Sequence, residues 1–269
     1  MLSSVSTFRQ FLALPALIVL AGIGLSQPGP ASRKFELTQA DLDALVQKAN
    51  KTIQEQFTKD TPDLMELRSQ ALLIALAAQN RMSGHKDDRL RLATLRDSAV
   101  KLARSLPAHV AISTVQFNEA RKHAAVLAQF PKLKIDPKAM NEIIRLKGTF
   151  DQEDIDLHFS NWAGGNRIER QLIALIRQKT PLSAEQMTDA IPPLAFKVAL
   201  LAEMLRDFDD HVRPNKVAQR KEWVALATEV QYTGWELAEV ARTKNADATR
   251  KVIVSLNNAC TNCHSKFRE

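Results

Sequence analysis

Apolar residues recur every three or four positions along most of the chain from Thr38 onward. Residues at this spacing share one face of an α-helix, so each such segment predicts a helix with one buried stripe. In the first segment Thr38 is followed three residues later by Asp41, a pairing typical of a capping box at a helix start. Its buried stripe is expected to consist of Leu42, Leu45, Val46, Ala49, Ile53 and Phe57. Further helices are expected at 64–82, 87–106 and 113–130.

The stretch 131–165 is the least regular part of the chain, because it contains two prolines, three glycines and an acidic run at 151–156. Proline removes a backbone donor and glycine is conformationally free, so this composition predicts a connection between domains. A short helix is expected within it at 138–147. His158 and Trp162 are candidates either for docking this linker against the following domain or for packing in the domain junction.

The rest of the chain again shows helical periodicity. Asn166 with Glu169 predicts a helix start, and Ser183 with Gln186 predicts a capping box. Pro192 and the proline after it are expected to break or restart the helix that follows. Later helices are expected up to residue 208, at 215–243 and from Asn245 to residue 267. The apolar face of the last helix is expected to comprise Ala248, Val252, Leu256, Ala259, Cys260, Cys263 and Phe267.

The composition favours an all-α protein. Of the 269 residues, 45% are hydrophobic and only 6% aromatic, and there are eight glycines. The strong helix formers Ala, Leu, Lys, Arg, Glu and Gln dominate the segments between prolines. The expected organisation is a helical bundle at 38–130, the linker at 131–165 and a second helical domain at 166–269.

Residues 1–26 differ from the rest of the chain, because Arg9 is their only charged residue and an apolar run spans 11–25. This run contains Pro15 and is shorter than the ~20 apolar residues of a transmembrane helix, but it suits the core of a signal peptide. We therefore expect a cleaved export signal at 1–26, with an uncleaved membrane anchor as the alternative. A flexible leader is expected at 27–37, and the mature protein is expected in the periplasm.

The formal net charge is +7, from 37 basic and 30 acidic residues. Removing residues 1–26 takes away one basic residue, which leaves 36 basic and 30 acidic residues and a charge of +6. A positive balance favours an acidic redox partner or an anionic lipid surface. The charges are spread along the helices without a Lys/Arg block or interleaved aromatics, so no nucleic-acid partner is expected.

The two cysteines of the chain are Cys260 and Cys263, and His264 follows directly. The pattern Cys-x-x-Cys-His is the attachment site of c-type haem. Positions three and four residues apart share a helix face, so two thiols and an imidazole lie on one side. The thiols can bond to the haem vinyl groups, and the imidazole can take an axial position on iron. We therefore predict one covalently bound haem c.

Two other uses of a Cys-x-x-Cys pair are open at this point. A thioredoxin-like dithiol is expected after a strand in a βαβ unit, whereas the C-terminal region shows helical periodicity only. A structural zinc site needs four ligands, usually from two such pairs, and the chain has one pair. The sequence contains no Gly-rich phosphate loop or nucleophile elbow, so we expect no catalytic residues and no enzyme activity.

The residues that follow the motif extend this interpretation. Phe267 and Arg268 complete the pattern Cys-x-x-Cys-His-x-x-Tyr/Phe-Arg, and a long helix containing Trp223 precedes it. With these features the segment 215–269 resembles the cytochrome c prime family, the class II c-type cytochromes. Such a domain needs only about half of this chain. Whether 38–130 is a duplicated bundle that has no haem motif is open.

The resemblance implies a four-helix bundle at 166–269 in which Cys260 and Cys263 hold the haem and His264 is the proximal iron ligand. Arg268 would lie near a haem propionate or be a solvated residue that is favourable at a helix C-terminus. Similar proteins are bacterial periplasmic electron carriers or gas-binding haem proteins. Bundles of this type often pair, so a homodimer is also expected.

The ligand on the far side of the iron separates the functional hypotheses. A Met thioether or a second imidazole favours electron transfer with a redox partner protein, whereas an apolar residue leaves iron that binds NO or CO. Met204 is the distal candidate, with Met187 and His211 as weaker ones and core packing as the alternative for Met204. A third hypothesis is a partner-binding protein with a structural haem. Solvent or interface positions are expected for His85, His109, His123 and His158.

Overall fold

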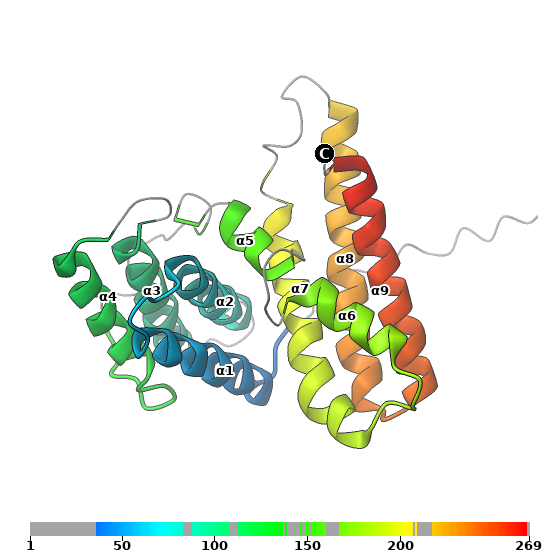
Figure 1. Cartoon of the computed structure of the whole chain (residues 1–269), viewed down its shortest axis with the longest axis horizontal. Helices are drawn as coiled ribbons and strands as arrows, with labels where there is room; N and C mark the ends of the chain where they lie inside the picture. Colours follow the sequence, from blue (N-terminus) through cyan, green and yellow to red (C-terminus); the bar gives the residue numbers. More distant parts are fainter. Residues whose placement is uncertain are drawn as a thin grey trace, which may run out of the picture. The chain divides into compact units, whose positions relative to one another are not determined.

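Helices make up nearly all of the described chain, and its described residues contain no β-strand (Figure 1). The computed structural model describes residues 36–82, 88–107, 112–136, 138, 146, 149–150, 152–159, 167–206, 208 and 217–267. These residues form α1 (Gln39–Phe57), α2 (Leu64–Met82), α3 (Arg89–Ser105), α4 (Thr114–Leu127), α5 (Gln152–Phe159), α6 (Ile168–Arg177), the π-helical turn η1 (Gln186–Ala190), α7 (Ile191–Leu205), α8 (Val217–Arg242) and α9 (Ala246–Phe267). The all-α fold class is therefore confirmed.

The first helix follows its predicted cap and buried stripe closely. Thr38 Oγ1 accepts a hydrogen bond from Asp41 N at 3.2 Å, and Asp41 Oδ2 accepts one from Thr38 N at 3.0 Å, which confirms the predicted capping box. All six stripe residues of α1, from Leu42 to Phe57, are buried. α1 packs against α2 and α4, and both of these pack against α3. The apolar stripes therefore determine which faces of these helices meet.

A π-helical turn connects the second predicted capping box to α7. Ser183 N donates to Gln186 Oε1 at 2.8 Å, and Gln186 N donates to Ser183 Oγ at 3.1 Å, as predicted. Pro192 and Pro193 lie in the first turn of α7, where the missing N–H of proline costs no intrahelical bond. The backbone stays helical through the wider π turn into α7, so the two prolines neither end nor break the helix.

α8 packs against both α7 and α9, and α6 packs against α9 (Figure 1). α8 approaches α7 closely at Gly234, where an added Cβ would lie 3.1 Å from Ala195 O and 3.1 Å from Ala199 N. Since both of these are backbone atoms, any side chain at this position would push the two helices apart. The glycine therefore sets the spacing between α7 and α8. α6 has Arg167 as its N-cap, without a side-chain capping bond, while Asn166, which was predicted to start this helix, lies outside the described residues.

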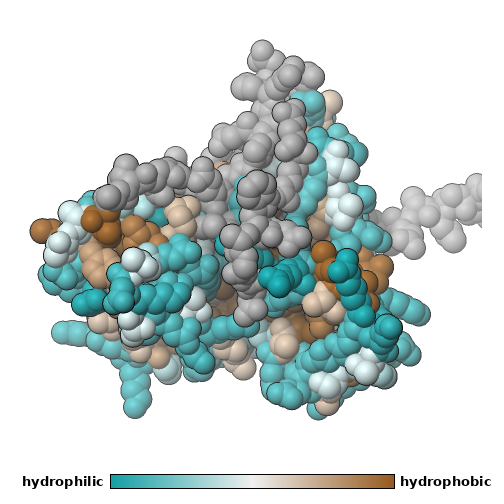
Figure 2. Space-filling model, in the orientation of Figure 1, coloured by the Kyte–Doolittle hydropathy of each residue, from teal (hydrophilic) through white to brown (hydrophobic). Residues whose placement is uncertain are grey.

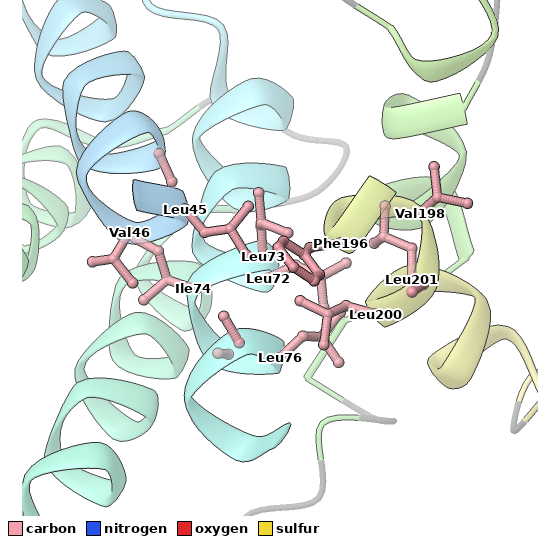
Figure 3. Close-up of a cluster of buried hydrophobic side chains, with 14 of the residues drawn as sticks. Leu45, Val46, Leu72, Leu73, Ile74, Leu76, Phe196, Val198, Leu200 and Leu201 are labelled. Atoms are coloured by element: carbon pink, nitrogen blue, oxygen red, sulfur yellow. The ribbon is translucent and has the colours of Figure 1, made fainter. Parts of the chain in front are cut away.

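One hydrophobic core extends from the group α1–α4 into the group α6–α9, through contacts of α1 and α2 with α7. Figure 3 shows Leu73 of α2 facing Phe196 of α7 within this core. By its internal contacts the chain from Phe35 to Glu269 forms one compact unit. The predicted division into two domains separated by a linker at 131–165 stays a prediction.

Within the stretch predicted as a linker, α5 is attached to α2 by buried polar contacts. Arg68 Nε donates to Asp154 Oδ1 at 2.9 Å, and Arg68 Nη2 donates to Asp154 Oδ2 at 2.7 Å. His158 Nε2 lies 2.8 Å from the carbonyl oxygen of Ser69. Through this bond His158 of α5 contacts α2. Trp162 and most of the helix predicted at 138–147 lie outside the described residues.

The start of the described chain is fixed to α2. Leu37 N donates to Asn80 Oδ1 at 3.2 Å, and Leu37 O accepts a bond from Arg81 Nη1 at 2.5 Å. The last residue of the predicted flexible leader is therefore held in place, while the predicted signal at 1–26 lies outside the described residues. No helix in the described part of the chain is long and apolar enough to cross a membrane. Hydrophilic residues cover most of the described surface on the face in Figure 2.

Candidate haem-attachment site

The Cys-x-x-Cys-His motif occupies the last turns of α9. Asn245 Oδ1 accepts a hydrogen bond at 3.0 Å from the backbone N–H three residues later, which caps the helix start as predicted. The inward face of α9 then runs through Leu256 to Cys260, and both are buried. Cys263 and His264 are partly exposed. The helix thus presents one thiol to the interior and holds the second thiol and the imidazole at the edge of its packed face.

Both cysteines are free, and their surroundings keep the thiols protonated. Burial, the negative charge of Glu169 and the neighbouring Cys263 thiol together raise the pKa of Cys260 to about 12. Burial also raises the pKa of Cys263. A redox dithiol acts through a thiolate of lowered pKa, so this environment disfavours the thioredoxin-like alternative.

A carboxylate from α6 faces the imidazole of the motif. Glu169 Oε1 lies 3.1 Å from His264 Nδ1, and the Glu169 side chain is only 15% exposed. Histidines that bind metals usually direct their second ring nitrogen to a carboxylate or carbonyl, which fixes the ring and its tautomer. Because Nδ1 faces Glu169, Nε2 is the ring nitrogen left for a metal. The sequence indicated Glu169 only as a helix-start residue, since no local pattern links it to a histidine almost a hundred positions away.

Three side-chain contacts bring three helix ends together next to the motif. The Trp223 and Phe267 rings pack edge to face, with centroids 5.2 Å apart and an interplanar angle of 87°. Trp223 Nε1 donates a 2.7 Å hydrogen bond to the Leu205 carbonyl. An ion pair between Lys266 of α9 and Glu222 of α8 also joins these two helices. The end of α7, the start of α8 and the end of α9 therefore lie at one end of the helical group formed by α6 to α9.

Met204, the distal candidate, is buried in the last turn of α7. It directly precedes Leu205, the residue whose carbonyl accepts the Trp223 bond. Met204 therefore lies at the same end of the helical group as the motif. It remains a candidate for the sixth coordination position.

Met187 lies near the opposite end of α9. Its Sδ is 4.0 Å from Thr249 Oγ1, and Thr249 is separated from Cys260 by about 16 Å along the helix axis. Met187 is thus too distant from the motif for an axial role. His211 and Arg268, for which the sequence indicated a weaker distal role and a propionate contact, lie outside the described residues.

The remaining described histidines serve other contacts. His123 Nε2 lies 3.4 Å from Glu119 Oε1 on α4, and burial lowers the pKa of His123. Burial also holds the pKa of His158 well below its ordinary value, so this neutral ring donates from Nε2 to the Ser69 carbonyl. His158 is therefore an interior residue. His85 and His109 lie outside the described residues. Across the described ranges, no group of three or more His, Cys, Asp or Glu side chains is arranged to hold a metal ion.

No protein-family model, curated protein or solved structure matches this chain. The functional interpretation therefore depends on the residues of the site. Two thiols and an imidazole on one face of α9, with a carboxylate against the imidazole Nδ1, are a donor set that fits a c-type haem.

Proposed function

We propose that this chain is an exported c-type cytochrome that carries one haem and exchanges electrons with a redox partner protein. The observation that supports this most strongly is the arrangement at the end of α9, where Glu169 Oε1 lies 3.1 Å from His264 Nδ1 beside the two cysteines. The thiols provide the covalent attachment points, and the carboxylate leaves Nε2 of the imidazole to bind iron. When bound, the haem supplies a one-electron iron couple.

The side chains around the motif have separate roles in this proposal. Cys260 and Cys263 would hold the haem through thioether bonds, so that it could not dissociate between oxidation states. The Glu169 carboxylate, 3.1 Å from His264 Nδ1, would favour the tautomer with its proton on Nδ1, and its negative charge would favour oxidised iron. The Trp223–Phe267 contact, with ring centroids 5.2 Å apart, holds the end of α9 against α8 and keeps the motif in register with its neighbours.

Met204 is our candidate for the sixth iron ligand. It is buried at the end of α7, on the side of the helical group where α9 carries the motif. A thioether in this position favours electron transfer and raises the reduction potential relative to a second imidazole. Met187 provides a matched control, since it is also a buried methionine and contacts Thr249 near the start of α9.

The proposal places the mature protein in the periplasm, with 1–26 acting as a cleaved signal. The mature chain would carry a formal charge of +6, because residues 1–26 contain one basic and no acidic residue. A redox partner with an acidic docking surface fits this charge.

The function is tested by absorption spectra of the full chain, produced in a bacterial host that attaches c-type haem to exported proteins. We expect a c-type haem spectrum in both oxidation states, a reversible one-electron wave and a ferrous Soret band that does not move with carbon monoxide. Met204→Leu should open the site so that carbon monoxide shifts the band, while Met187→Leu should behave as the wild type. A carbon monoxide shift in the wild type would contradict electron transfer through a six-coordinate iron and would indicate a gas-binding protein.

A further inference from the structure

A cavity of about 410 Å³ lies among α1, α2, α5, α6 and α7. Its walls include the apolar side chains Leu45, Leu73 and Leu194 and the charged side chain Lys197. Small-molecule sites in proteins typically measure ~300–1,000 Å³, so this cavity has room for a small organic ligand. None of the motif residues on α9 lines it.

Cations reach this cavity from three helical segments. Lys48 of α1, Arg167 at the start of α6 and Lys197 of α7 all line it. Besides burial, the positive charges of Lys48 and Arg167 lower the pKa of Lys197, as expected for cations that line the same cavity. The negative charge of Glu66 raises the pKa of Lys197. Glu66 Oε1 also accepts a 2.7 Å hydrogen bond from Gln70 Nε2. Like Lys48, the other charged lining residues are exposed to solvent: Glu55, Lys59 and Asp63.

Lys197 is the cation of this cavity that is best placed to bind a ligand. It is half-buried, and within the described part of the chain its ammonium group makes no hydrogen bond or ion pair. Burial lowers the pKa of Lys197 to about 8, so the group is still mostly protonated at neutral pH. A buried ammonium loses hydration, and charged acceptor oxygens restore the lost interactions most effectively.

We propose that this cavity binds a small organic anion whose carboxylate or phosphate accepts hydrogen bonds from Lys197, with its apolar body against Leu45, Leu73 and Leu194. Arg167 adds a second cation on the α6 side of the cavity, and Lys48 attracts the anion at the rim. Most of the lining is polar, but Leu45, Leu73 and Leu194 offer an apolar contact that the body of an organic acid can use and a bare inorganic ion cannot. This inference does not depend on the haem.

Thermal unfolding of the full chain at pH 7 tests the proposal with three probes at about 10 mM: hexanoate, succinate and inorganic phosphate. A ligand that binds only the folded chain at 100 times its Kd should raise the unfolding midpoint by about 5 °C or more. A shift with hexanoate or succinate that exceeds the shift with phosphate supports an organic anion. A shift with phosphate alone would overturn the organic-anion assignment, and no shift with any probe would overturn the site.

Substitution of Lys197 tests the contact itself. Lys197→Met keeps the unbranched chain and removes the charge, and it should weaken binding of the active probe at least tenfold by calorimetry, as expected for the loss of a charge-assisted hydrogen bond. Lys251→Met, on the exposed face of α9, is the matched control and should bind as the wild type does. Equal affinities of the Lys197→Met and wild-type chains would overturn the proposal.

Discussion

The guanidinium of Arg68 on α2 connects the end of α3, Thr149 and α5, and its removal should be costly. Besides the two bonds to Asp154, Arg68 Nη1 donates to the carbonyls of Ala103 at 3.1 Å and Leu106 at 3.0 Å, and Nη2 donates to Thr149 O at 3.2 Å. These contacts use all five donors of the guanidinium. The Asp154 side chain is 0% exposed, so water cannot replace the lost partner.

Arg68→Met should therefore destabilise the fold strongly. Breaking a buried ion pair by removing one partner costs about 3–5 kcal/mol, because the remaining charge stays buried and unpaired. For a unit of this size each 1 kcal/mol lowers the unfolding midpoint by about 2–4 °C, so we expect a fall of about 6–20 °C. The double variant Arg68→Met with Asp154→Leu should recover part of this loss, because it leaves no buried charge, although the carbonyls of Ala103, Leu106 and Thr149 still lose their donor.

Thermal and urea unfolding, both followed by circular dichroism, provide the measurement. Lys122→Met is the control, because Lys122 also forms an ion pair, 3.1 Å from Glu119, but its side chain is 74% exposed. Exposed pairs of this kind contribute about 0–1 kcal/mol. If Arg68→Met cost no more than Lys122→Met, or if the double variant were less stable than Arg68→Met, the reasoning about the buried pair would be refuted.

Three further substitutions test other parts of the structure. Gly234→Val should destabilise by about 1–3 kcal/mol in urea unfolding, because its Cβ would lie 3.1 Å from Ala195 O; a more stable variant would contradict the close helix contact. Burial lowers the pKa of Lys197 from 10.5 to about 8, so above pH 8 the folded chain binds fewer protons than the unfolded chain and gains stability up to pH 10.5. Between pH 8 and pH 10.5 the wild type should gain ~3 kcal/mol of stability over Lys197→Met; parallel stability–pH curves of the two chains would refute this prediction. Glu169→Gln should raise the haem reduction potential by about 60 mV in spectroelectrochemistry, since a negative charge beside His264 stabilises oxidised iron; an unchanged potential would exclude this role.

Local signals in the sequence predicted much of the fold. The capping boxes at Thr38 and Ser183 were predicted because both partners lie within one helical turn of each other. The buried stripe of α1 was predicted because helical spacing alone determines which side chains share a face. Such features need no knowledge of the tertiary fold.

Contacts between distant residues were not predicted. The segment that contains Asp154 and His158 reads as an acidic linker, yet both residues are buried because their partners, Arg68 and Ser69, lie on α2. A local sequence pattern contains no information about such partners. The same applies to the candidate site, where the sequence predicted the cysteines and His264 but not the carboxylate opposite its Nδ1.

Intact mass of the exported chain under denaturing conditions tests the central proposal most directly. Only a covalently attached haem survives denaturation, so we predict a mass equal to the mature chain plus one haem, together with a haem-stained band on a denaturing gel. The variant with both Cys260→Ala and Cys263→Ala should show the mass of the bare chain, while Ser255→Ala on the exposed face of α9 should retain the haem. A wild-type chain without haem, in cells where a control c-type cytochrome matures, would contradict the account.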